Sequence, residues 1–184
     1  MASKKPKKLE EPLTRCDGTL TESAYLAFIR STLRSKSLRW KPRSNALEKA
    51  RRPYKGPNKR QKWEYLCDIC KGYFKQDETH VDHHPKPAGS ILSVEDIGNF
   101  AENLFCNSDN LRVLCVECHA IHTVSESHNL TFEEARKLKV IIDLLKPANK
   151  SKMEVLLKEH NYVCKNAVQR RAALTEIFDK ESHD

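Results

Sequence analysis

The chain has 184 residues, of which 39% are hydrophobic and 32% are charged. It is therefore long enough for one domain with its own core, and its composition is that of a soluble protein. No apolar run approaches the roughly 20 residues that a membrane helix needs, and the lysine-rich start lacks the apolar segment of a signal peptide. We expect no membrane association and a cytoplasmic location.

Charge is distributed unevenly along the chain. Residues 1–62 carry 18 Lys and Arg against 5 Asp and Glu, residues 63–128 carry 4 against 11, and residues 129–184 carry 11 against 9. A basic segment of this kind predicts a polyanion partner that is bound through phosphate contacts. The alternative, a solvated tail that only aids solubility, fits the first lysines but fits less well from Arg30 onward, where basic and large apolar residues alternate.

The N-terminal third predicts a tail followed by helices. Residues 1–18 are charged and without periodicity, which is typical of a disordered tail. Thr19 begins a capping box, and apolar residues at helical spacing predict a helix that reaches Trp40 and is stopped by Pro42. A second short helix is expected from Ser44 to Arg52, followed by a basic linker or extended arm. We interpret residues 19–62 as a basic helical DNA-binding extension.

Short strands and helices are expected in the rest of the chain. Residues 63–66 and 79–83 read as strands, and the turn between them is expected to use Gly72 for its tight backbone. An amphipathic helix should begin at Ser93. Residues 111–114 read as a short strand or a loop that leads into Cys115, and a helix should begin near Val116. Three further helices are predicted from the capping boxes Thr131/Glu134, Ser151/Glu154 and Asn166/Gln169.

Two closely spaced cysteine pairs, 44 residues apart, predict a metal site. Two residues between thiolates let both sulfurs reach one tetrahedral ion, and two such pairs complete a closed shell for a structural Zn²⁺. A redox dithiol and chance spacing are the alternatives. We interpret the three remaining cysteines, Cys16, Cys106 and Cys164, as small apolar side chains. The four predicted zinc ligands are Cys67, Cys70, Cys115 and Cys118.

A second group of polar residues lies between and just after the cysteine pairs. Asp82 is followed directly by His83, and His119 and His122 are three positions apart, on one face of the expected helix. A carboxylate oxygen with imidazoles nearby suits a second, divalent cation with open positions. A histidine beside that cation can take a proton from water near neutral pH. Taken alone, Asp82 would be an ordinary turn residue.

These residues carry a family resemblance. VDHHP, followed by NLRVLC and CVECHAIHT within a frame of four cysteines, resembles the HNH endonuclease family, and the stretch LFCNSDNLRVLCVECHAIHT resembles its phage-encoded members. The resemblance covers about residues 65–123. It implies an α+β, mostly helical fold in which a small ββα-metal core at 63–128 contains the four-cysteine zinc and is flanked by N-terminal helices and a C-terminal helical segment at 129–184.

The same resemblance implies the site residues and cofactors. His83 would be the general base, Asp82 and His119 would bind the catalytic Mg²⁺, Mn²⁺ or Ni²⁺, and Asn110 would orient His83 or reach the metal. The chain departs from the family pattern at His84, which is usually aliphatic, and at His122, where lysine is frequent, so His122 is a further candidate ligand. The activity implied is hydrolysis of DNA phosphodiester bonds, with a monomer expected to nick.

DNA is the expected partner, in the host cytoplasm if the chain is phage-encoded, and phage or host DNA-processing proteins are further candidates. Nothing in the sequence indicates base readout, so we expect mainly phosphate contacts with weak sequence preference. Trp40 and Tyr54 would either pack or stack on bases. RNA as substrate, a non-catalytic zinc-containing nucleic-acid-binding protein and a zinc-stapled interaction module are the alternatives. The predicted DNA contacts are Lys36, Arg39, Lys41, Arg43, Arg51, Arg52, Lys55, Lys59, Arg60 and Lys62.

Overall fold

The structure, a computed structural model, describes residues 12–84 and 93–180. Helices predominate over three small sheets, which confirms the expected mixed, mostly helical class. The chain divides into two compact units, Met1–Val113 and Leu114–Asp184, whereas the predicted domains divide it after residue 128. No helix in the described ranges is long and apolar enough to span a membrane.

The first described residues form a hairpin. Strand β1 (Leu13–Arg15) pairs antiparallel with β2 (Leu20–Thr21), so the prediction of disorder is wrong from residue 13 onward, while residues 1–11 lie outside the described residues. The Arg15 guanidinium donates to the Glu22 carboxylate at 2.9 Å, and this bond holds the pKa of Glu22 below its usual value. An ion pair seven residues apart gives no periodic signal, which is why the sequence pattern misses this hairpin.

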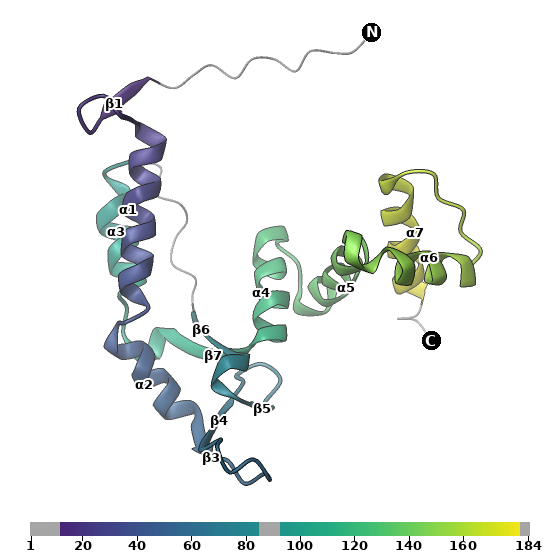
Figure 1. The fold of residues 1–184 in the computed structure, drawn as a ribbon, viewed down its shortest axis with the longest axis horizontal. Helices are drawn as coiled ribbons and strands as arrows, with labels where there is room; N and C mark the ends of the chain where they lie inside the picture. The colour runs from purple at the N-terminus through teal and green to yellow at the C-terminus, as the bar shows by residue number, and fades with distance from the viewer. Residues whose placement is uncertain (1–11, 85–92, 181–184) are drawn as a thin grey trace. The chain divides into compact units, whose positions relative to one another are not determined.

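Helix α1 (Glu22–Ser37) packs against α3 (Asp96–Leu104), and Figure 1 shows the two side by side. Leu26 of α1 is buried with Phe100 and Leu104 of α3, and these three residues are the core of the cluster. The N-cap of α1 is Thr21, whose hydroxyl accepts the Ala24 N–H at 3.1 Å, and the predicted cap two residues earlier is wrong.

Helix α2 runs over Lys41–Ala50, so it begins earlier than predicted. Pro42 lies in its first turn, where the missing N–H leaves no bond unmade. The prediction that Pro42 stops the preceding helix is therefore wrong, because α1 already ends at Ser37 and Pro42 helps to start α2. The predicted cap Ser44 lies inside α2.

Three strands form one antiparallel sheet, in the order β3 (Arg51–Pro53), β4 (Trp63–Leu66) and β5 (Tyr73–Phe74). A second sheet pairs β6 (Thr79–His83) with β7 (Leu111–Cys115), and the short helices η1 (Gln76–Glu78) and η2 (Ser108–Asn110) lead into these two strands. The predicted strands at 63–66 and 79–83 are confirmed, and the segment 111–114 is a strand and not a loop. Residues 51 and 52 are in a strand and not at the end of a helix, since their partners lie across the sheet.

The second unit is helical. It contains α4 (Val116–His128), α5 (Phe132–Leu144), η3 (Pro147–Asn149), α6 (Lys150–Glu159) and α7 (Ala167–Lys180). Its core lies among α5, α6 and α7, and its buried members are Ile141, Met153, Leu157, Ala173, Leu174 and Ile177. The predicted cap Ser151 lies inside α6, whereas Asn166 accepts the Gln169 N–H at 2.9 Å as expected for a cap.

The capping box that opens α5 gives a stability prediction. Thr131 accepts the Glu134 N–H at 3.3 Å, the Glu134 carboxylate accepts the Thr131 N–H at 2.8 Å, and these bonds lower the pKa of Glu134. Replacing Thr131 with alanine should lower the free energy of unfolding by about 1 kcal/mol, measured by urea denaturation at neutral pH. Because a lowered folded-state pKa stabilises only while the group is ionised, this difference should shrink as the pH falls through the pKa of Glu134.

Thr175→Ala is the matched control, since its hydroxyl only bonds the Arg171 carbonyl oxygen at 3.0 Å inside α7. This control should change the free energy of unfolding by less than about 0.5 kcal/mol. Equal losses in the two variants would show that the Thr131 side chain contributes nothing as a cap.

Candidate functional site

Four cysteines form the clearest site of the structure. One sulfur from each of Cys67, Cys70, Cys115 and Cys118 lies within 4.8 Å of the others. Within ranges 12–84 and 93–180 this is the one group of three or more Cys, His, Asp or Glu side chains close enough to hold an ion. Three of the cysteines are buried and Cys70 is exposed. Four thiolates at this separation fit a tetrahedral Zn²⁺, which has Zn–S bonds of about 2.3 Å.

The first cysteine pair lies in a tight turn after β4. The Cys67 N–H donates to the Gly72 carbonyl at 2.9 Å, and the Lys71 N–H donates to the Cys67 carbonyl at 3.0 Å. The residue with a left-handed backbone in this turn is Lys71, with φ 58°. The prediction that Gly72 supplies the tight backbone conformation of the turn is therefore wrong. Gly72 is needed for space, because a Cβ there would lie 2.9 Å from the Phe74 ring.

The second pair lies where β7 passes into α4. Cys115 is the N-cap of α4, and its sulfur accepts the Cys118 N–H at 3.3 Å. The positive end of a helix and an N–H donor both favour a thiolate over a thiol, which is the form that binds zinc. The junction between β7 and α4 is therefore sufficient to position the Cys115 sulfur as a ligand.

His83 lies on β6 and contacts the end of α3. Its Nε2 is 3.0 Å from the Leu104 carbonyl oxygen, and the side chain is half-buried. A carbonyl only accepts, so this contact requires a proton on Nε2 of His83. In the neutral ring Nδ1 then carries the lone pair, so Nδ1 is the atom that accepts a proton.

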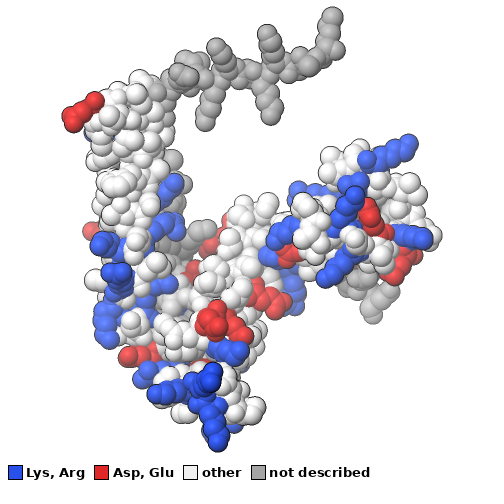
Figure 2. Space-filling view, viewed as in Figure 1, with Lys and Arg blue, Asp and Glu red and all other residues white. Residues whose placement is uncertain are grey.

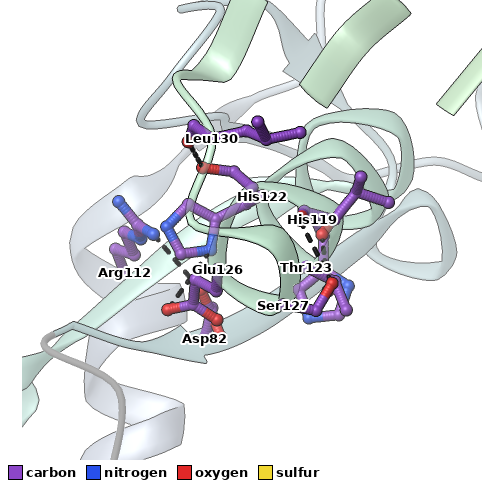
Figure 3. A network of polar contacts seen from close by, with 10 residues as sticks. Asp82, Arg112, His119, His122, Thr123, Glu126, Ser127 and Leu130 are labelled. Atoms are coloured by element: carbon purple, nitrogen blue, oxygen red, sulfur yellow. Dashed lines mark hydrogen bonds and ion pairs between the residues drawn. The ribbon is translucent and has the colours of Figure 1, made fainter. Parts of the chain in front are cut away.

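Asp82 lies near two arginines. Its Oδ2 lies 3.4 Å from the Nη2 of Arg112 on β7, and the two side chains are only 21% and 13% exposed (Figure 3). Burial lowers the pKa of the Arg43 guanidinium on α2, while the charge of nearby Asp82 acts in the opposite direction. Sequence analysis missed both arginines as site residues near Asp82, because neither is close to it in the chain. A carboxylate has about four acceptor positions, so the ion pair with Arg112 is compatible with a metal bond.

Asn110 ends η2 and lies beside the end of β6. Its backbone carbonyl accepts the His84 N–H at 2.8 Å, which joins the start of β7 to the end of β6. The group that contacts the His83 ring is the Leu104 carbonyl, and the role predicted for the Asn110 side chain stays a prediction. A cleft of about 330 Å³ borders His84 and Arg112 in this unit.

His119 and His122 both lie on α4, as the predicted helix requires. Figure 3 shows His122 beside Glu126, with 3.7 Å between Nδ1 and the nearer carboxylate oxygen, and the Thr123 hydroxyl bonded to the His119 carbonyl at 2.9 Å. The spacing of four between His122 and Glu126 was a visible signal that sequence analysis did not use. The predicted metal bonds of His119 and His122 remain predictions.

Of the two aromatic residues considered for stacking on bases, Trp40 is used for packing. Its ring makes an edge contact with Phe105, with 5.5 Å between centroids, and its Nε1–H donates to the Cys106 carbonyl at 2.9 Å. Tyr54 lies over the Gly56 backbone, where a Cβ would be 2.1 Å from its hydroxyl. Burial raises the pKa of the Cys106 thiol, which agrees with its interpretation as an uncharged side chain.

The predicted DNA contacts fall into two sets. Lys36, Arg39, Lys41 and Arg43 lie on or between α1 and α2, and the other six lie on or between β3 and β4. Arg52 is bonded to Glu64 at 2.6 Å, which raises the pKa of its guanidinium, so part of its charge is neutralised within the protein.

Comparisons of the chain with protein-family models, with curated proteins and with solved structures find no match.

Proposed function

We propose that the protein is a metal-dependent DNA endonuclease of the HNH type, in which His83 activates a water molecule. The observation that carries the proposal is the contact of His83 Nε2 with the Leu104 carbonyl, on the strand that also carries Asp82. This contact orients the imidazole with Nδ1 as the proton acceptor, which is what a general base needs.

The chemistry follows from these groups. Nδ1 of His83 removes a proton from water, the resulting hydroxide oxygen forms a bond to the phosphorus, and the bond from phosphorus to the 3′ oxygen breaks. A divalent cation would offset the charge that develops on the phosphate and the leaving oxygen. Asp82 and His119 would hold that cation, with Asn110 or His122 as further candidates.

The arginines near Asp82 support a phosphate as the substrate. The middle of the chain carries excess negative charge, yet the largely buried Arg112 and the half-buried Arg43 place two guanidiniums near Asp82. Planar guanidiniums bind phosphate oxygens well. The cleft beside Arg112 offers room for a sugar-phosphate segment next to β6.

The four-cysteine site would then be a structural zinc centre. Its shell is complete, so it leaves no position for substrate. Among its ligands, Cys67 directly follows β4 and Cys115 is the last residue of β7. Strand β7 pairs with β6, the strand that carries Asp82 and His83. Zinc would thus hold the catalytic strand pair in place without taking part in the reaction.

A plasmid assay tests the proposal. Wild-type protein should nick supercoiled DNA when Mg²⁺, Mn²⁺ or Ni²⁺ is added and should not do so without an added divalent cation. Asp82→Asn should remove nicking at cation concentrations that saturate the wild type, because the variant loses a charged ligand. The control Asp77→Asn changes an exposed carboxylate in η1 and should nick like the wild type. Intact plasmid under every metal would reject the enzyme and leave a binding protein.

A further inference from the structure

The hairpin of β3, β4 and the loop between them, residues 51–66, carries concentrated positive charge. Residues 51–63 contain six Lys and Arg and no Asp or Glu, and all six side chains are exposed. Figure 2 shows this charge gathered at the end of the unit that bears β3 and β4, at the bottom of the view. The first unit, residues 1–113, has 22 basic residues against 14 acidic ones, whereas the second has 11 of each.

The loop of the hairpin, residues 54–62, keeps its charges without internal counter-ions. None of its four basic residues forms an ion pair with any residue that the structure describes. By contrast, the nearby Lys49, Lys71 and Lys75 each pair with a carboxylate. Four like charges within nine residues repel one another, so this loop is suited to an external polyanion. The four residues are Lys55, Lys59, Arg60 and Lys62.

The loop has a defined backbone. Its ends are joined by the Tyr54 N–H, which donates to the Lys62 carbonyl at 3.0 Å. At its tip Asn58 accepts two backbone N–H groups, that of Arg60 through its side-chain oxygen and that of Gln61 through its carbonyl, both at 3.1 Å. These bonds hold the charged side chains in one region, which reduces the entropy lost when they bind a partner.

The base of the hairpin is held by arginines stacked on aromatic rings. Arg51 lies 4.5 Å from the centroid of Trp63, and Arg52 lies 3.3 Å from that of Tyr73. Because β5 pairs with β4 only at Tyr65 and Leu66, the hairpin is a two-stranded ribbon from there to its tip. Cation–π contacts of this kind stabilise the ribbon without a hydrophobic core around it.

We infer that this hairpin enters the major groove of duplex DNA and provides the main phosphate contacts of the protein. The inference rests on the proposed function for the choice of DNA. A major groove about 12 Å wide admits a two-stranded ribbon without deformation, whereas a minor groove about 6 Å wide must first be widened. The deep, narrow major groove of duplex RNA excludes it. The hairpin therefore selects duplex DNA over duplex RNA.

Binding of full-length protein to matched DNA and RNA duplexes tests the inference, in a His83→Ala background without added divalent cations so that nothing is cut. The variant with Lys55, Lys59, Arg60 and Lys62 all changed to glutamine should bind duplex DNA at least about 100-fold more weakly at 100 mM salt. The slope of log K against log salt should fall in magnitude by about 3 to 4, since each lost phosphate contact contributes about 0.9. Preference for DNA over RNA should disappear.

A matched variant controls for net charge. Changing Lys152, Lys158, Lys165 and Arg171 to glutamine removes the same charge from exposed positions of the second unit. This control should keep the affinity and the salt slope of the parent protein. Equal losses in the two variants would overturn the hairpin as a specific contact, and so would tighter binding to duplex RNA or to single strands than to duplex DNA. Both variants should retain the zinc content and the circular dichroism of the parent.

Methylation interference identifies the groove. Dimethyl sulfate modifies N7 of guanine in the major groove and N3 of adenine in the minor groove. Methylation of guanine N7 should weaken binding of the protein, and methylation of adenine N3 should not. Interference confined to adenine N3 would overturn the inference. The proposed function can fail separately. A wild-type protein that never nicks plasmid but passes these binding tests would reject the endonuclease proposal and leave the hairpin inference standing. A wild-type protein that nicks plasmid, with a hairpin variant that binds DNA normally, would support the endonuclease proposal and reject the hairpin inference.

Discussion

Replacing Cys67 with serine is expected to release zinc and to unfold the region around β4 and β7. Cys67 is fully buried and provides one of four sulfurs in the cluster, and a serine hydroxyl is a poor ligand for zinc. Binding of a structural zinc ion contributes about 10 to 16 kcal/mol in small zinc domains, and this energy is folding energy. Metal analysis should find about one zinc per wild-type chain and much less in the variant, whose thermal transition should lie lower or be lost.

Cys106→Ser is the matched control for this prediction. Cys106 is half-buried and lies outside the cluster. This variant should bind as much zinc as the wild type. Wild-type protein purified without zinc, or a Cys67→Ser variant with full zinc content, would contradict the structural zinc site.

Replacing His83 with alanine is expected to reduce the rate of nicking by about 100- to 10,000-fold, the usual contribution of a general base. The affinity for duplex DNA should not change, because His83 is half-buried on β6 and is not among the basic residues of the hairpin. Single-turnover rates on plasmid, with binding measured separately, would establish both points. Added imidazole should restore part of the lost rate, since it can replace the missing proton acceptor.

His160→Ala is the control, because His160 is exposed after α6, far in sequence from β6. It should nick at the wild-type rate. A His83→Ala variant that nicks normally would remove the proposed role of His83. A variant that is inactive and not rescued by imidazole would indicate a structural role for this side chain.

Elements with local signals were predictable from the sequence. The capping box of Thr131 and Glu134 placed the start of α5, and the short extended segments predicted at 63–66 and 79–83 are β4 and β6. The hairpin of β1 and β2 and the strand β3 were not predicted, because they depend on partners that sequence periodicity does not reveal. Arg51 and Arg52 are extended because of Trp63, Glu64 and Tyr73 across the sheet.

The site followed the same division. The cysteine spacing predicted a four-sulfur cluster, which the structure confirms, and adjacency suggested Asp82 with His83. Arg112, Arg43 and the Leu104 carbonyl were not predictable, since they reach Asp82 and His83 on β6 from other elements. A backbone carbonyl in particular leaves no mark in the residue types of a chain.

The contact between His83 and the Leu104 carbonyl limits which N-terminal segments could replace the present one. Leu104 is buried at the end of α3, in the cluster that Leu26 of α1 completes. The N-terminal helices are therefore part of the support of the imidazole, and β3 adds an edge to the sheet that precedes the first cysteine pair. Replacing the N-terminal helices with another module would therefore also change the support of the His83 imidazole, because the Leu104 carbonyl that contacts this ring is held by packing against α1.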